Sequence, residues 1–174
     1  MSTNPELFEL SMSKKTQPLM DLVKKHCEEN IKPIQQEYSA LQNEKEDRWT
    51  WHPRQIELME GAKDKARELG LWNFFLPDPD GNIGDGLTNL DYTYVATEIG
   101  KYPLASESMN CSAPDTGNME VLERVGTEEQ KKQWLEPLLN GEIRSAYAMT
   151  EPNLASSDAK NISTSAVLDG DEWV

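Results

Sequence analysis

A change in hydrophobic period at Ile143 is the feature that most restricts how this chain of 174 residues can fold. Before Ile143, apolar residues recur at every third or fourth position, which is typical of amphipathic helices. After it, apolar and polar residues alternate, which indicates strands. We therefore expect a mainly α chain, with a helical domain over residues 1–142 and the start of a β-domain over residues 143–174.

Proline, glycine and capping residues divide the helical part. Pro33 should end or kink the first helix near Ile31, because the proline ring removes a backbone donor. A second helix should begin at Pro53 and end before Gly70. A turn-rich loop over 77–86 precedes three more helices: residues 88–99 with a Thr88–Asp91 capping box, 115–125, and 127–139 with a Thr127–Gln130 capping box.

The apolar positions of these helices define the faces that should be buried. A helix that packs on a core on one side repeats such positions with a period near 3.6 residues. The positions are Leu19, Leu22, Val23, Cys27, Ile31, Ile34, Tyr38 and Leu41 in the first helix, Ile56, Met59, Ala62, Ala66 and Leu69 in the second, and Trp134, Leu135, Leu138 and Leu139 in the last.

Two strands and a hairpin turn are expected after Ile143. The first strand should cover residues 143–150 and the second residues 161–168, whose strict alternation predicts a half-buried strand. Asp169-Gly170 is a hairpin-turn pair, so residues 172–174 should begin the returning strand.

Composition excludes several functional classes. The formal net charge of −14 argues against nucleic-acid binding, which needs a basic surface. No apolar run approaches the roughly 20 residues of a membrane-spanning helix. Cys27 and Cys111 are far apart, and His26 and His52 have no metal-ligand spacing around them, so neither a disulfide framework nor a metal site is expected. No secretory or mitochondrial signal is visible in residues 1–10, which favours the cytoplasm.

The run from Tyr147 to Asp158, YAMTEPNLASSD, resembles the flavin-binding signature of the acyl-CoA dehydrogenases. That signature is an aromatic residue, two further residues, Thr-Glu-Pro, and then Ala-Gly-Ser-Asp or a close variant. Residues 127–135 are similar to the family's preceding helix, and residues 161–174 to the start of its β-domain. One extra residue before Ala155 and a serine at Ser156 depart from the commonest form, and both occur in the branch that carries Ala-Ser-Ser-Asp.

The resemblance assigns cofactor contacts to five residues, and their chemistry agrees with it. The amide and hydroxyl of Thr150 can donate to the pyrimidine edge of FAD, and Tyr147 and Met149 can flank the ring system. Ser156 and Ser157 offer small hydroxyls and close backbone approach to a pyrophosphate. The family also implies that Ser157 contacts the acyl-CoA substrate. By themselves, these residues are equally compatible with an ordinary strand and serine-rich turn.

For the fold, the resemblance implies an acyl-CoA dehydrogenase-like amino-terminal helical domain, followed by the first strands of a β-barrel-like middle domain. For the activity, it implies FAD-dependent α,β-dehydrogenation of acyl-CoA thioesters in fatty-acid β-oxidation, with electron-transfer flavoprotein as acceptor, in a homo-oligomer that is mitochondrial or peroxisomal. The family's catalytic carboxylate belongs to C-terminal helices beyond these residues. We therefore expect no catalytic residue here, a structural role for Glu151, and a truncated chain that is inactive alone.

Two alternatives stay open. The chain could belong to an acyl-CoA oxidase-like flavoenzyme, which passes electrons to oxygen instead of to a protein. It could also be a non-catalytic family remnant that acts through protein contacts. The sequence that follows residue 174 would separate the remnant from the two enzymes.

Overall fold

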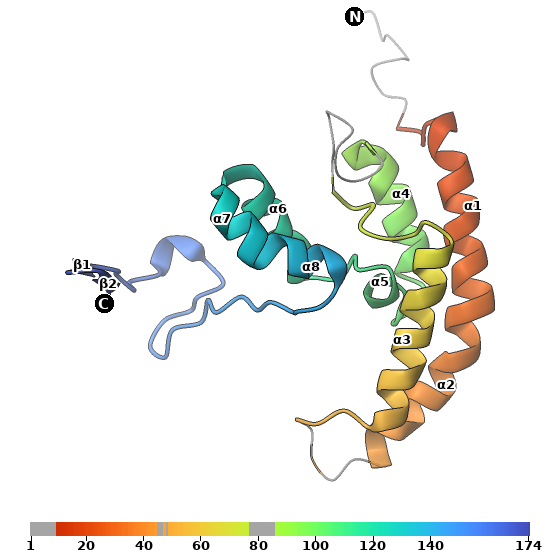
Figure 1. Ribbon diagram of the computed structural model, residues 1–174, viewed down its shortest axis with the longest axis horizontal. Coiled ribbons are helices and arrows are strands. Elements are labelled where there is room, and N and C mark those ends of the chain that lie inside the picture. Colours follow the sequence, from red (N-terminus) through yellow and green to blue (C-terminus); the bar gives the residue numbers. More distant parts are fainter. Residues whose placement is uncertain (1–9, 45–46, 48, 77–85) are drawn as a thin grey trace, which may run out of the picture.

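The computed structural model describes residues 10–44, 47, 49–76 and 86–174, and most of them are helical. Figure 1 shows the helices gathered together, with the chain after α8 running away from them to a small hairpin at the C-terminus. The mainly α fold predicted from the sequence is confirmed. Its elements are α1 (Gln17–His26), α2 (Lys32–Leu41), α3 (Pro53–Glu68), α4 (Asn89–Ile99), α5 (Ala105–Ser108), α6 (Asp115–Val125), α7 (Glu128–Gln130), α8 (Glu136–Asn140), β1 (Leu168–Asp169) and β2 (Glu172–Trp173).

Short helical turns of other types connect or precede several of these elements. The π-helical turns are η3 (Cys27–Ile31) and η5 (Lys131–Leu135), and the 3-10 turns are η2 (Lys14–Thr16), η4 (Gln42–Glu44) and η6 (Ala159–Asn161). Within the described part of the chain, every helix falls short of the length and apolar character that a membrane crossing requires. Most of the loop expected over 77–86 lies outside the described residues.

Helices α1 and α2 form one continuous curved rod, joined by the π-helical turn η3 (Figure 1). The kink expected near Ile31 is therefore present, and it takes the form of a wider turn. Pro33 lies in the first turn of α2, where its missing N–H costs little, and the N–H of Lys32 bonds to the carbonyl of Cys27. Because the helix widens instead of ending, Val23, Cys27 and Ile31 all remain fully buried on one face.

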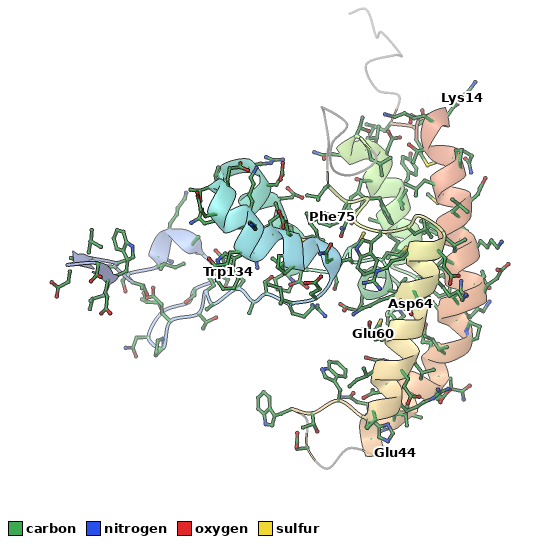
Figure 2. All side chains as sticks on the ribbon, viewed as in Figure 1. Lys14, Glu44, Glu60, Asp64, Phe75 and Trp134 are labelled. Atoms are coloured by element: carbon green, nitrogen blue, oxygen red, sulfur yellow. The ribbon has the colours of Figure 1, made fainter. Side chains whose placement is uncertain are left out.

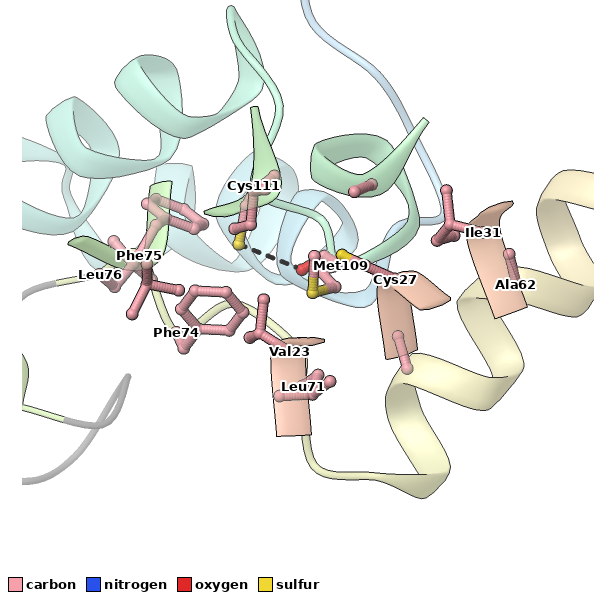
Figure 3. Packing of buried hydrophobic residues seen from close by; sticks show 14 of the residues in the cluster. Val23, Cys27, Ile31, Ala62, Leu71, Phe74, Phe75, Leu76, Met109 and Cys111 are labelled. Atoms are coloured by element: carbon pink, nitrogen blue, oxygen red, sulfur yellow. Dashed lines mark hydrogen bonds between the residues drawn. The ribbon is translucent and has the colours of Figure 1, made fainter. Parts of the chain in front are cut away.

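The hydrophobic core lies between this rod, α3, α4 and the irregular segment 71–76. In Figure 3, Phe74, Phe75 and Leu76 gather beside Val23, Leu71 and the Cys111–Met109 pair. The Cys111 thiol donates to the Met109 carbonyl at 3.3 Å, which the dashed line marks. Cys27 and Cys111 are both free and buried, and burial raises their thiol pKa values to about 11 and about 12.

Three residues predicted to be buried are instead exposed: Leu22, at 37%, Ile56 and Trp134. The Ile56 side chain is 51% exposed, and Gln55 is buried in its place because its amide donates to the Tyr38 carbonyl at 3.0 Å. Trp134 is 48% exposed and lies at the helix surface in Figure 2. It falls within the π-helical turn η5, and the neighbouring Leu135 and Leu138 are buried in the core.

The predicted caps are largely confirmed. Thr127 and Gln130 form a complete capping box at the start of α7. Thr88 caps α4 by accepting the Asp91 N–H at 3.1 Å. The buried Asp91 carboxylate accepts bonds from the Ser13 N–H at 2.7 Å and the Thr88 hydroxyl at 2.9 Å, so it ties the chain before α1 to α4.

The end of α8 is held against the segment that follows α3. Gly141 ends the helix in the left-handed region, at φ 72°. The Leu139 carbonyl accepts from Trp72 Nε1 at 2.7 Å and from Asn73 Nδ2 at 2.8 Å. A Cβ at Gly141 would meet the Trp72 ring at 2.9 Å, so both the conformation and the space require glycine there.

The strand predictions are wrong over most of their length. Among the described residues, 143–150 have no ladder partner, and they form an extended but irregular segment. Residues 161–168 are mostly exposed, and only Leu168 and Asp169 pair, with Trp173 and Glu172. Strands with alternating apolar and polar residues need a second layer to cover their apolar face, and the described residues provide none.

The predicted hairpin is confirmed, with its turn displaced by one residue. Asp169 pairs with Glu172, so the two-residue loop is Gly170-Asp171, and Gly170 has φ 69°. Val167 and Val174 exchange backbone bonds at 2.8 and 2.9 Å beyond the paired residues. The hairpin is thus closed by local bonds.

His26 is buried at the end of α1 in a hydrogen-bond chain that requires its neutral form. Ser108 Oγ donates to the Ala105 carbonyl at 2.8 Å, so it accepts from His26 Nε2–H at 2.9 Å. His26 Nδ1 is then free to accept from Asn30 Nδ2 at 3.3 Å. Burial lowers the pKa of His26 from 6.5 to about 4.

Acidification should therefore destabilise the protein before its carboxylates titrate. The folded pKa of His26 lies below the unfolded value, so the unfolded chain takes up a proton first as pH falls below 6.5. Between about pH 7 and pH 4.5 this should lower the free energy of unfolding by roughly 2 kcal/mol. Chemical denaturation across this range measures the slope. A His26→Gln variant that loses stability just as steeply would contradict the assignment.

Candidate functional site

The extended segment after α8 is attached to the helices through Asp115, the first residue of α6. Asp115 Oδ1 accepts from the backbone N–H and the hydroxyl of Ser145, at 2.7 and 2.6 Å, and Oδ2 accepts from Arg144 Nε at 2.5 Å. Asn118, on the next turn of α6, donates to Ser145 Oγ at 2.8 Å. Helix α6 therefore determines where the extended segment, which carries the motif from Tyr147 onward, leaves the helical body.

The Asp115 carboxylate stays ionised although it is buried. Burial by itself would raise its pKa, but the bonds from Ser145 and Arg144 outweigh that effect and hold the pKa below its usual value. Arg144 also pairs with Glu107 at 2.6 Å, and Glu107 lies 3.5 Å from Lys63. These charges link α3, α5 and α6 to the extended segment.

A second carboxylate, that of Glu151, closes the far end of the same segment. It accepts from the backbone N–H groups of Ser163, at 3.0 and 3.2 Å, and of Thr164, at 2.8 Å. It also accepts from the hydroxyls of Ser163, at 3.0 Å, and Thr164, at 2.7 Å. Bonds from Thr164 and then Ser163 lower the pKa of Glu151 to about 2, so the group is a poor proton acceptor at neutral pH.

The five predicted cofactor residues fall into two groups. Ser156 is buried, and its hydroxyl accepts from the Glu151 N–H at 2.8 Å and donates to the Leu154 carbonyl at 3.3 Å, so it closes a local turn. Thr150 and Ser157 are exposed on either side of that closure, Tyr147 is 71% exposed, and Met149 is half-buried. Their contacts with a cofactor and a substrate stay predictions.

A groove of about 450 Å³ lies elsewhere, beside α2 and α3. Its lining includes Tyr38, Met59, Lys63, Glu107 and Arg144, and none of the five predicted cofactor residues. Arg144 is the residue that this groove shares with the attachment at Asp115. The groove is therefore not the site that the sequence motif indicates.

Sequence reasoning missed the attachment at Asp115 and anticipated only a general structural role for Glu151. Asp115 was placed correctly at the start of a helix, but its partners lie 29 and 30 residues away. No periodicity or cap signal pairs residues across such a distance. The partners of Glu151 are 12 and 13 residues away, and the motif gives no signal for them.

Comparison with known proteins identifies the family of this chain. Residues 13–142 match the family described as acyl-CoA dehydrogenase, N-terminal domain. The chain is 45% identical over 172 residues to acyl-CoA dehydrogenase family member 10 of Mus musculus, covering 93% of this chain and 16% of that protein. It is 44% identical over 177 residues to family member 11 of Homo sapiens, covering 100% of this chain and 21% of that protein.

A solved structure shows the same fold. A Mycobacterium abscessus protein, provisionally described as an acyl-CoA dehydrogenase, superposes with a TM-score of 0.82 at 42% identity. The match covers 94% of this chain and 40% of that one. The chain thus spans less than half of the solved protein and 16 to 21% of the two curated relatives.

Proposed function

The chain belongs to the acyl-CoA dehydrogenase family, and we propose that it supplies part of the flavin and substrate site of an FAD-dependent acyl-CoA dehydrogenase. The reaction would be α,β-dehydrogenation of an acyl-CoA thioester in fatty-acid β-oxidation. We also infer a domain boundary between residues 142 and 143, where the family match ends and the extended segment begins. The proton-abstracting base and electron acceptor would lie outside these residues.

One observation carries this proposal: the turn in the flavin-type motif, residues 147–158, is closed internally while the donors beside it are exposed. Ser156 and Glu151 are occupied by bonds within the segment, and Thr150 and Ser157 remain exposed. A ligand with several acceptor oxygens and ring nitrogens fits such a surface, because it can accept from hydroxyls and amides that have no role in the fold.

Each of the remaining motif residues has a definite task in this proposal. When bound, FAD would supply the hydride-accepting ring. Thr150 would donate to the polar edge of that ring, and Tyr147 and Met149 would flank it. Ser157 would serve both the cofactor and the thioester arm of the substrate. These residues bind and orient, and none of them moves a proton.

A chimera tests the proposal. Residues 1–174 would replace the matching segment of the Mycobacterium abscessus relative, which makes up 40% of that chain. We expect a yellow protein whose flavin bleaches when an acyl-CoA is added without oxygen. Thr150→Val should raise the Kd for FAD about tenfold, because it removes one donor to the ring. Thr93→Val, on the exposed surface of α4, is the matched control.

The outcomes separate the possible functions. A folded but colourless chimera would contradict the proposal and favour a non-catalytic family member. Rapid reoxidation of the reduced flavin by oxygen would indicate an oxidase. For the 174 residues alone we expect weak FAD binding at most, since few contacts would offset the loss of cofactor freedom. A fluorescence titration measures that affinity.

A further inference from the structure

Glu151 joins two parts of the extended segment, the turn 151–156 and residues 163–164. Neither part belongs to the two-stranded sheet. Its N–H donates to Ser156 Oγ at 2.8 Å, which closes the turn 151–156. Its carboxylate, on the other side, receives the N–H and hydroxyl groups of Ser163 and Thr164 at 2.7 to 3.2 Å. A single residue therefore connects the turn to the chain that leads into the hairpin. We call these hydrogen bonds of Glu151 the clasp.

The two predicted ligand donors, Thr150 and Ser157, lie beside this clasp, and both are exposed. Thr150 precedes Glu151 directly, and Ser157 follows Ser156 directly. The orientation of both donors therefore depends on the two peptide units that the clasp holds. Apart from the clasp, the described part of the segment offers little packing, because nearly all side chains from Tyr147 to Thr164 are exposed or half-buried.

From this geometry we propose that Glu151 is a positioning residue: it orders the backbone of residues 150–157 before the flavin binds, and so sets the direction in which Thr150 and Ser157 donate. The proposal rests on the proposed function for its ligand. A donor held in place before binding costs less freedom on binding, and that saving appears as affinity. Glu151 itself would touch neither the flavin nor the substrate.

The chemistry of the clasp explains why a glutamate is required. All its partners on Ser163 and Thr164 are donors, and an ionised carboxylate offers acceptors on both oxygens. A glutamine of the same length would direct its Nε2 donor at one of these N–H groups. An aspartate would be one methylene shorter and unable to span both residues.

The first experiment measures the clasp without any flavin. Amide hydrogen exchange of Ser163 and Thr164 is followed by NMR in the 174-residue protein and in Glu151→Gln. We expect exchange at both amides to become at least about fivefold faster in the variant. Glu172→Gln, which changes an exposed glutamate in β2, is the matched control and should leave both rates unchanged. Equal rates in the protein and in Glu151→Gln would overturn the proposal.

The second experiment measures positioning, in the chimera described above. Glu151→Gln should raise the Kd for FAD about tenfold and alter the flavin circular dichroism, while the melting temperature of the helical part stays the same. Thr164→Val should act in the same direction, Thr164→Ser should retain affinity, and the double variant with Glu151→Gln should lose less than the sum of the single losses.

The two proposals fail in different ways. If the parent chimera binds FAD and Glu151→Gln binds it equally well with an unchanged flavin spectrum, Glu151 is not a positioning residue. A parent chimera that folds but binds no FAD contradicts the proposed function and, with it, the positioning role. Faster exchange in Glu151→Gln together with weaker FAD binding supports both proposals.

Discussion

Replacing Phe74 with Ala should lower the free energy of unfolding by about 3–5 kcal/mol, enough to unfold a marginally stable domain. Phe74 is fully buried in the segment 71–76, and its ring lies 6.2 Å from that of Tyr92. Figure 3 places it among Leu71 and Phe75 of the same segment and Val23 of α1. Its removal would leave a cavity that a close-packed core closes only partly.

Urea denaturation followed by circular dichroism measures this loss. Val121→Ala is the matched control, because Val121 is exposed on α6 and its truncation should change the free energy by less than about 0.5 kcal/mol. Phe74→Leu keeps most of the volume and should cost roughly 1 kcal/mol. If Phe74→Ala and Val121→Ala had equal stability, the core described here would be wrong.

Replacing Asp115 with Asn should lower the free energy of unfolding by about 2–3 kcal/mol. The side chain is almost fully buried and accepts three bonds from Ser145 and Arg144. An Asn of the same shape loses the charge and turns a donor toward one of these donors. Because Ser145 lies near the start of the extended segment that carries the motif, the same change should loosen residues 145–150.

A control variant and the loss of stability in acid test this prediction. Glu120→Gln alters another carboxylate of α6, whose ion pair with Arg124 is long and exposed, and it should cost less than about 0.5 kcal/mol. The pKa of Asp115 is lowered in the folded state, so its stabilisation is present above its unfolded pKa and is lost as pH falls through the folded pKa. Asp115→Asn should therefore show a smaller loss of stability in acid than the parent protein. An unchanged acid profile would contradict the role of this carboxylate.

Helix boundaries could be predicted from the sequence because each depends on a few neighbouring residues. Pro53 begins α3, Thr127 caps α7 and Gly141 ends α8, as their local chemistry requires. The flavin-type motif from Tyr147 to Asp158 is likewise contiguous, so its resemblance to a family can be recognised from the sequence.

The orientation of helix faces was harder to predict, because partners far away in the sequence decide it. Gln55 is buried in place of Ile56 since α2 offers its amide a carbonyl acceptor, at Tyr38. Trp134 is exposed within the π turn η5, a helical irregularity that a regular 3.6-residue period does not predict. The strand predictions were wrong for a related reason. A segment with alternating polarity forms a sheet only when a neighbouring strand pairs with it, and the described residues pair only at the hairpin.

The sequence by itself thus determined the helical character of this protein, its helix ends and its family, all of which are encoded in local or contiguous residues. Only the tertiary structure decided how the motif is held, with Asp115 at one end and Glu151 at the other. A carboxylate has no preferred partner along the chain. Its partners are the donors that folding brings within hydrogen-bonding distance and that burial or turn geometry leaves otherwise unsatisfied.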